Sequence, residues 1–477
     1  MIFNILFLSL FAFVFSKNSC YWNAQCPYNL YSTKTPYDTI RGDIRDYPNP
    51  ESKYCINFFN SIQRIWSLHR HGNRNPGDSV TEQIKKVVKL KEDIIHSFEA
   101  GTSQLCSQDI EEFRKWTWNE TLEISQSFLT GTGYEELFDI GKRIRERYPH
   151  LLTGNNDAYY FRPTNLQRTI TSAIAFVHGL TENTNLTLTI DEARERDDVI
   201  RPYSNCDRYQ VDVKGGQTLV DEIADYYNTV EFKAVQNGVQ QRLGFTVQLS
   251  HDEIYALYEI CRFHRTWDSK LQSPWCSVFT DHDLLVLEYR DDVRHYYRNG
   301  YGSWVNVNLG GAPLKDLYEN FEAVVQNRGR NIVSYFSHDT MMAMTFCAMG
   351  VFKDASPSHG SKRDERRLWR TSYTGSFSVN MIVVLNRCQE SGTQTHRVQF
   401  FINEKPTELC PLEGCTWQQF DEKFQRFANF NLDFCSFNYI VDEDKDIGSD
   451  SAITRSVISF VSVLYALVFL LSGSFIS

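Results

Sequence analysis

The sequence has 477 residues, 42% of them hydrophobic, and its 59 acidic against 49 basic residues give a formal net charge of −10. This length and hydrophobic content fit a sizeable enzyme built as one large domain or as two lobes. The negative charge argues against nucleic acid as a partner, so any attraction for an anionic substrate has to come from a local cluster of positive charge.

The chain begins with an apolar run, residues 1–16. Small or short residues near its end are placed for cleavage, although no Lys or Arg stands at its start. The pattern predicts a secretory signal peptide. We therefore expect the mature protein to be secreted or held at the cell surface.

The most informative stretch follows a strand-like apolar run, residues 62–68, and reads Arg70-His71-Gly72-Asn73-Arg74-Asn75-Pro76. Arginine presents a planar fork of donors that matches phosphate geometry and stays charged. A histidine between two such groups predicts a phosphate site with His71 as its nucleophile. The alternative, a strand end with exposed basic residues before a turn, needs only one or two of these identities. His69 should face the other side of the strand and pack there.

Two segments, residues 81–130 and 186–281, look helical and charged, and strand-like runs flank them. The pattern predicts an α/β core, about residues 31–80, 131–185 and 282–440, with those two segments as a helical cap inserted after the nucleophile strand. Four cap lysines are candidates for lining the approach to the site, although lysine-rich helices are usually solvated faces. They are Lys85, Lys86, Lys89 and Lys91.

A second basic motif follows the aromatic run at residues 159–161, where Thr164 and Gln167 fit a capping box that starts a helix. Arg168 then falls in the first turns of that helix. A cation there opposes the helix dipole, which indicates that Arg168 serves a bound anion. The alternative is a solvated helix arginine.

A third motif, His338-Asp339, lies between a buried strand-like run, residues 331–336, and a helix-like segment, residues 341–349. Ligands of open α/β sheets bind beyond the carboxyl ends of strands, and helix N-termini there favour anions. We expect His338 to donate to a phosphate oxygen and Asp339 to protonate a leaving group. Asp339 is also a plausible helix N-cap.

The chain ends with an apolar segment, residues 457–476, preceded by a polar cluster of small residues at 446–452. This order is typical of a glycosylphosphatidylinositol (GPI) anchor signal, with attachment near residues 448–451. The competing interpretation is a single transmembrane helix, since about 20 apolar residues can span a bilayer. No basic residue follows the segment, which favours the lipid anchor.

Twelve cysteines behind a signal peptide imply a disulfide framework. Short separations suggest the local bridges Cys20–Cys26, Cys261–Cys276 and Cys410–Cys415. We expect no metal site, because no Cys-x-x-Cys pair is present. Asn119 and Asn185 begin Asn-x-Thr sequons and are candidate glycosylation sites.

The three motifs, in this order, resemble the histidine acid phosphatase branch of the histidine phosphatase superfamily. Residues 31–37, 172–180 and 403–406 are similar to the multiple inositol-polyphosphate phosphatases and phytases. The resemblance spans roughly residues 21–438. One position departs from it, because the inositol-polyphosphate phosphatases usually carry His-Ala-Glu where this chain has His338-Asp339-Thr340.

The resemblance implies a phosphoglycerate-mutase-like α/β domain, residues 17–445, with a mainly parallel sheet flanked by helices and an active site between core and cap. It implies that His71 becomes phosphorylated and that Asp339 serves as proton donor and then as base. The phosphate-binding groups would be Arg70, Arg74, Arg168 and His338. No metal or other cofactor is implied, because the arginines supply the positive charge.

The phytase-like cysteine pattern adds the bridges Cys55–Cys388 and Cys206–Cys435, which leaves Cys106 and Cys347 over. Cys347 is expected as a buried free thiol. The implied substrate is a small phosphorylated molecule, in particular an inositol polyphosphate such as phytate. The alternatives are a broad-specificity acid phosphatase and a non-catalytic surface binding protein on the same fold.

Overall fold

The computed structural model describes residue 20 and residues 28–47, 63–267, 273–390 and 393–438. The expected signal peptide, Cys26, Cys55 and the C-terminal apolar segment lie outside the described residues. Within the described ranges, no helix is both long enough and apolar enough to cross a membrane.

The centre of the molecule is a mixed sheet with strand order β2-β3-β1-β4-β5-β6, and β7 pairs with β5. The pairs β1–β3 and β2–β3 are parallel, whereas β1–β4, β4–β5, β5–β6 and β5–β7 are antiparallel. The α/β class is confirmed, but the sheet is mixed rather than mainly parallel, because β4 runs against β1 and returns directly as β5. The strands are β1 (Gln63–Arg70), β2 (Tyr159–Pro163), β3 (Ile332–Ser337), β4 (Asn380–Glu390), β5 (Thr393–Ile402), β6 (Lys405–Pro406) and β7 (Cys415–Thr416).

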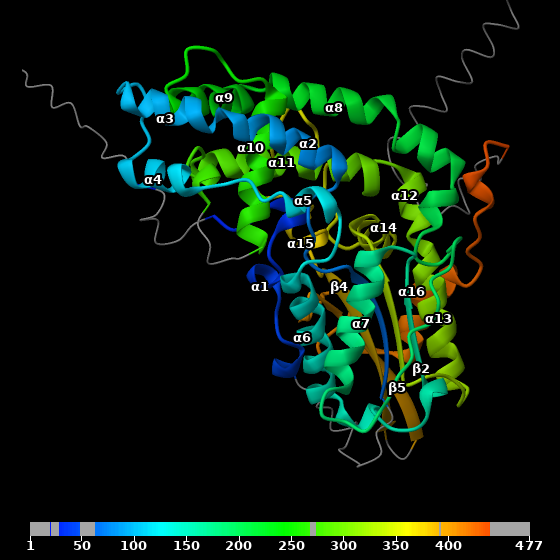
Figure 1. Cartoon of the computed structure of the whole chain (residues 1–477). Helices are drawn as coiled ribbons and strands as arrows, with labels where there is room; N and C mark the ends of the chain where they lie inside the picture. The colour runs from blue at the N-terminus through cyan, green and yellow to red at the C-terminus, as the bar shows by residue number, and fades with distance from the viewer. Residues whose placement is uncertain (1–19, 21–27, 48–62, 268–272, 391–392, 439–477) are drawn as a thin grey trace, which may run out of the picture.

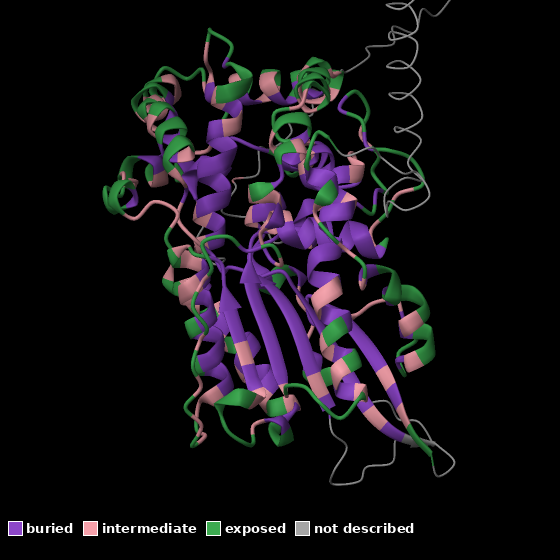
Figure 2. Ribbon diagram, turned by 90° about the vertical axis from the view of Figure 1, so that its right-hand side faces the viewer, coloured by how far each residue is buried: buried purple, intermediate pink, exposed green. Residues whose placement is uncertain are grey.

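Helices cover both faces of the sheet (Figure 1). Alternate side chains of β1 enter different clusters: Ile65 packs with the helices α6 and α7, while Trp66 and Leu68 pack with α13, α14 and α16. Strands buried on both faces therefore read as continuous apolar runs, and Figure 2 shows them buried along most of their length. These helices are α6 (Gly131–Arg147), α7 (Gln167–Thr181), α13 (Gly311–Val325), α14 (Asp339–Met349) and α16 (Trp417–Phe424).

A further group of helices, here called the helical layer, lies at the top of Figure 1 and shares one apolar cluster. Its members are α2 (Asp78–Val87), α3 (Lys91–Glu99), α4 (Ser107–Lys115), α8 (Gln217–Asn228), α9 (Val230–Leu243), α10 (His251–Trp267) and α11 (Asp281–Asn299). The short helices are α1 (Tyr37–Ile40), α5 (Thr121–Ile124), α12 (Trp304–Leu309) and α15 (Thr371–Thr374).

Two of the four lysines expected to line the approach to the active site instead bind to nearby residues. Lys85 forms ion pairs with Glu82 and Glu123. Lys91 donates to the carbonyls of Arg114 and Trp116. Both ammonium groups therefore bind neighbouring segments of the helical layer, as solvated helix faces usually do.

Four disulfides are present among the described residues. Three confirm the predicted bridges Cys206–Cys435, Cys261–Cys276 and Cys410–Cys415. The predicted Cys20–Cys26 bridge is wrong, because Cys20 bonds to Cys106 across 86 residues of sequence, with Cα atoms 5.6 Å apart. Cys106 precedes α4, and packing of the helical layer brings it to the N-terminal segment, so sequence proximity misled the prediction.

The remaining cysteines fall into two groups. Cys388 is disulfide-bonded, and its predicted bond to Cys55 stays a prediction because Cys55 lies outside the described residues. Cys347 is a free, buried thiol on α14, which confirms the prediction.

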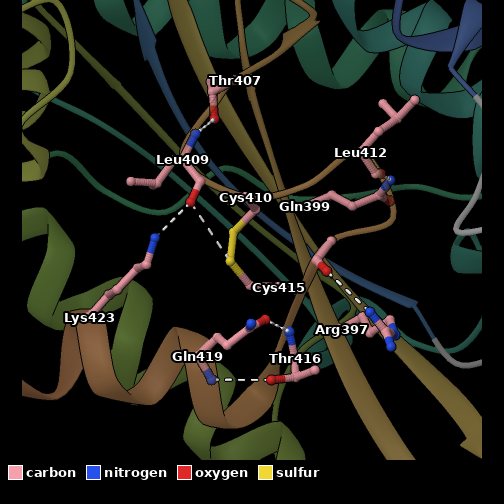
Figure 3. Close-up of a disulfide and its surroundings, with 11 residues drawn as sticks. Arg397, Gln399, Thr407, Leu409, Cys410, Leu412, Cys415, Thr416, Gln419 and Lys423 are labelled. Carbon is pink, nitrogen blue, oxygen red and sulfur yellow. Dashed lines mark hydrogen bonds between the residues drawn. A yellow bond between two sulfur atoms is a disulfide. The ribbon is translucent and has the colours of Figure 1, made fainter.

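The Cys410–Cys415 bridge closes the short loop that leads into α16 (Figure 3). Thr416 and Gln419 form a reciprocal capping box that starts this helix. Lys423 Nζ donates to the carbonyl of Leu409 at 2.9 Å, which ties the helix back to the loop. This end of the sheet is therefore fixed by local covalent and capping contacts.

Candidate active site

Two of the three motifs leave the sheet at the same edge. β1 and β3 are parallel and in register from Ile65↔Ile332 to Arg70↔Ser337. His71 and His338 are the next residues after these two strands, so they lie side by side. The backbone N–H of His71 donates to the carbonyl of Ser337 at 3.1 Å. The two imidazole rings meet edge to face, with centroids 5.6 Å apart.

His71 is buried and held in one tautomer. Its Nδ1–H donates to the carbonyl of Gly72 at 2.9 Å, which leaves the Nε2 lone pair free. Burial, followed by the nearby cations Arg70 and Arg168, holds the pKa of His71 well below its usual range. The imidazole is therefore neutral in mild acid, as a nucleophile at phosphorus requires.

Three arginines lie around His71 without forming an ion pair. Among the residues that the structure describes, none of Arg70, Arg74 and Arg168 forms an ion pair, and the Nε atom of each is buried without a hydrogen-bond partner. Burial lowers the pKa of Arg70 and of Arg168 to about 10, so both guanidinium groups stay charged. Arg70 is buried and Arg74 and Arg168 are half-buried, and cations so placed with unused donors indicate a site for an anion that matches the arginine fork.

The backbone orients two of these arginines. Arg70 Nη1 donates to the carbonyl of Thr33 at 2.6 Å and to that of Gly375, and its guanidinium lies 4.5 Å from the ring centroid of Phe377. Arg74 Nη1 donates to the carbonyl of Asn75 at 2.7 Å. The donors left over can face the centre of the site.

Thr164 connects the second motif to the third. Its Oγ1 lies 3.0 Å from His338 Nε2 and donates to Thr169 Oγ1. The predicted capping box is wrong, because α7 begins at Gln167 without a side-chain cap, and Gln167 instead accepts from the backbone N–H of Leu129. Thr164 is drawn away from the helix start by the contact with the buried His338.

Asp339 is the first residue of α14, and no side chain caps this helix. The structure therefore does not use the Asp339 carboxylate as an N-cap. Burial alone would raise the pKa of Asp339, but nearby groups, Arg70 first and then His295, hold it well below its usual range. The carboxylate is thus ionised in the protein without substrate.

His69 packs as predicted. It is fully buried, its ring stacks on Phe336 with centroids 5.2 Å apart, and its Nε2 bonds to Ser67 Oγ at 2.8 Å. Burial lowers the pKa of His69 to about 3, so it adds no charge to the site.

Sequence reasoning missed several polar groups around Asp339. Lys34, His295 and Arg201 interact electrostatically with Asp339 or His338. The i, i+4 spacing of three arginines on α11 was a usable signal, because it places them on one helix face. The groups missed around Asp339, His338 and His295 are Lys34, Arg201, Arg294, His295 and Arg298. Glu136, which interacts with Arg70, was also missed.

Comparison with known proteins gives consistent results. Residues 61–403 match the family described as histidine phosphatase superfamily (branch 2). The chain is 30% identical to multiple inositol polyphosphate phosphatase 1 of Drosophila melanogaster, over 84% of this chain and 85% of that protein. It also resembles the phytase from D. castellii, with a TM-score of 0.64 and 16% identity over 83% of this chain and 87% of that one.

A second similar structure is the Bifidobacterium longum multiple inositol polyphosphate phosphatase in complex with inositol hexasulfate. The TM-score is 0.60 at 15% identity, with 80% of this chain and 94% of that chain covered. At these identities, the two structural likenesses establish the fold.

Proposed function

The chain belongs to branch 2 of the histidine phosphatase superfamily and is a histidine acid phosphatase, and from this premise we propose that its substrates are inositol polyphosphates. We place the reaction at the carboxyl edge of the sheet, between the α/β core and a helical cap formed by residues 81–130 and 186–281. The proposed nucleophile is His71, and the proposed acid and base is Asp339.

The reaction proceeds in two balanced steps. His71 Nε2 attacks phosphorus, the bond from phosphorus to the ester oxygen breaks, and Asp339 gives a proton to the leaving alkoxide. Water then attacks the phosphohistidine, the P–N bond breaks, and the Asp339 carboxylate takes the proton of the water. Arg70, Arg74 and Arg168 neutralise the transferring oxygens through both steps.

The ionised state of Asp339 in the empty site fits this role once substrate charge is included. A bound phosphate neutralises Arg70 and the other cations that hold the pKa of Asp339 low, so the pKa rises when substrate binds. The same anion favours protonation of His338, whose pKa burial and Arg168 keep low in the empty site. His338 can then donate from Nδ1 while Nε2–H stays on Thr164. Proton delivery is therefore favoured in acid.

The observation that supports the inositol polyphosphate proposal is that the region around His71 carries more positive charge than one phosphate group can neutralise. Beyond the three arginines around His71, Arg201 and Arg294 have no ion-pair partner in the described part of the chain. Arg201 lies close enough to Arg168 to lower its pKa, and its Nε is buried without a partner. Arg294 interacts electrostatically with His295, which also interacts electrostatically with Asp339. A substrate with several phosphates supplies the missing counter-ions.

A broad-specificity acid phosphatase is the second candidate. Asp339 directly after His338 favours it, because the inositol-polyphosphate phosphatases usually place a glutamate one residue later. Such an enzyme would need only the phosphate that sits on Arg70, Arg74 and Arg168. The two candidates therefore differ in whether Arg294 and Arg201 affect turnover.

We also propose secretion and display at the cell surface through a lipid anchor. Four disulfides agree with an oxidising compartment. Both sequon residues, Asn119 and Asn185, are exposed and so accessible for glycosylation. Release from cells by a phosphatidylinositol-specific phospholipase tests the anchor, and resistance to it would favour a spanning helix.

The test of the substrate proposal compares phosphate release from inositol hexakisphosphate and from an aryl phosphate. We expect His71→Ala to abolish both activities. Arg294→Met should lower kcat/KM for inositol hexakisphosphate by about 10-fold or more, because loss of a charge-assisted hydrogen bond costs binding free energy of that size. The rate with the aryl phosphate should stay close to wild type. Equal losses on both substrates would instead support the broad acid phosphatase.

A further inference from the structure

Glu136 lies on α6 beside the loop that carries His71. The backbones of the two segments touch: a Cβ added to Gly133 would lie 2.1 Å from the carbonyl oxygen of Asn73, and one added to Gly72 would lie 2.2 Å from that of Gly133. Only glycine fits at these two positions. Glu136, one helical turn after Gly133, is therefore held next to the nucleophile loop.

One carboxylate oxygen of Glu136 joins two loops of the site. Its Oε2 accepts from the backbone N–H of Asn73 at 2.9 Å and from Ser378 Oγ at 2.6 Å. Ser378 has a φ of 57° and its backbone N–H donates to the carbonyl of His71 at 3.2 Å. Glu136 thus connects the loop after β1 with the loop before β4.

The Asn73 N–H belongs to the same peptide group as the Gly72 carbonyl that holds His71. At one end of this peptide the carboxylate accepts from N–H, and at the other the carbonyl accepts from His71 Nδ1–H at 2.9 Å. Hydrogen bonds in series polarise each other, so negative charge on Glu136 makes the Gly72 carbonyl a stronger acceptor. Ser172 Oγ accepts from the Gly72 N–H at 3.1 Å and keeps the loop in place.

We propose that Glu136 is a positioning residue that acts on His71 through the Gly72–Asn73 peptide. Its carboxylate keeps the proton on Nδ1 and orients the Nε2 lone pair toward phosphorus, as an outer carboxylate does for a metal-bound or catalytic histidine. Glu136 itself does not touch the substrate. The inference rests on the proposed role of His71 as nucleophile.

The charged and polar groups that face Glu136 define its pH dependence. They are Arg70 at the end of β1, Asp38 on α1, the Asn73 N–H and Ser378. Burial raises the pKa of Glu136 to about 7, Asp38 adds to the rise, and the two hydrogen bonds and Arg70 oppose it. Because the ionised carboxylate is the stronger acceptor, the rate of His71 phosphorylation should gain a component that increases as pH rises toward 7.

The experiment is rapid-quench measurement of phosphoenzyme formation from an aryl phosphate between pH 5 and 8. We expect Glu136→Gln, which keeps the shape and removes the charge, to slow phosphorylation by about 10- to 100-fold at pH 7. Its KM and thermal midpoint should stay close to wild type, and the component near pH 7 should disappear. Glu135→Gln, at the exposed neighbouring position, is the matched control and should behave as wild type.

Ser378→Ala provides a second variant. It removes one of the two hydrogen bonds to Glu136 Oε2, so the pKa of the carboxyl should rise and the pH component of phosphorylation should move upward. An unchanged or lower position would overturn the inference. So would Glu136→Gln with a wild-type rate and pH profile, or with a loss confined to KM or to thermal stability.

The same assay separates this inference from the proposed function. If wild-type protein forms no phosphoenzyme, or if His71→Ala still forms one, the proposed nucleophile is wrong. If wild-type protein forms it on His71 and Glu136→Gln matches wild type, only the role of Glu136 is wrong.

Discussion

Buried or half-buried arginines occur in two regions of this protein, and they differ in their partners. In the helical layer, Arg262 donates to Glu259 and to Asp291, and Arg367, in the segment before α15, donates to Asp292 of α11. At the sheet edge, Arg74 and Arg168 have no carboxylate partner among the described residues. Arg262 and Arg367 are buried and Arg74 and Arg168 are half-buried, and the two sets differ in whether a carboxylate pairs with them.

This difference separates a structural role from a binding role. A buried ion pair with satisfied hydrogen bonds holds segments together, and removal of one partner leaves an uncompensated charge. A buried cation without a partner costs stability in the empty protein and gains interaction energy when an anion arrives. At the carboxyl end of the sheet, Arg70, Arg74 and Arg168 together outweigh the Asp339 carboxylate, which interacts electrostatically with all three. This region is therefore positive although the whole chain carries a net charge of −10.

The largest expected effect comes from removing an unpartnered arginine. Arg168→Met should lower kcat/KM by about 10³-fold, as loss of a charge that stabilises a phosphoryl transition state does. Stability should stay the same or increase, because an uncompensated cation is removed. Steady-state kinetics and thermal unfolding check both parts, and a clear loss of stability would show that Arg168 is structural.

The opposite pattern is expected for Arg262 in the helical layer. Arg262→Met leaves Glu259 and Asp291 short of a counter-ion, so the free energy of unfolding should fall by about 3–5 kcal/mol. Chemical denaturation measures the change. The matched control is Arg114→Met, which breaks exposed pairs and should have no measurable effect. Unchanged stability of Arg262→Met would remove the distinction between the two regions.

Binding of inorganic phosphate offers a smaller effect that needs no turnover. At a concentration about 100 times its Kd, phosphate should stabilise the wild type by about 2.7 kcal/mol. Arg262→Met should keep this gain relative to its own baseline, while Arg168→Met should lose most of it. Equal protection of both variants would place the phosphate site elsewhere.

The smallest expected effect concerns Lys34, which lies between the two regions, 3.9 Å from Glu259. Burial and the neighbouring Arg262 lower the pKa of Lys34 to about 7, so its ammonium is charged below that pH and neutral above it. The KM for inositol hexakisphosphate should therefore increase as pH rises through 7. Lys34→Arg should remain charged at pH 8. It should then bind inositol hexakisphosphate about 5- to 10-fold more tightly than wild type, which corresponds to about 1–1.4 kcal/mol of binding free energy.

Lys34→Met separates charge from side-chain bulk. It should match wild type at pH 8 and bind more weakly at pH 5. If the KM of all three proteins follows the same pH profile, Lys34 does not carry the substrate charge.

The sequence located the groups that gather at the site where one short segment contains them. His71 and its flanking arginines lie within a few residues of each other, and the motif at His338 ends a strand that could be recognised by its apolar run. The bridges Cys261–Cys276 and Cys410–Cys415 were also predictable, because short loops close at little cost in entropy.

Prediction failed where a partner comes from another element. The spacing of Thr164 fitted a capping box, but its hydroxyl oxygen instead hydrogen-bonds to the buried His338. Cys20 bonds to Cys106 because two distant segments pack together. Glu136 is an ordinary helix residue in sequence, and only the close approach of Gly133 to the nucleophile loop gives it a role.

The sequence by itself thus determined the α/β class, the strands that end at the site and the identity of the groups around His71, because strand period and motif spacing are local properties of the chain. Tertiary structure alone decided the mixed sheet, the Cys20–Cys106 bridge and the pairing of each buried charge. Whether an arginine has a counter-ion depends on which helix packs against it, and that follows from the packing of the whole core.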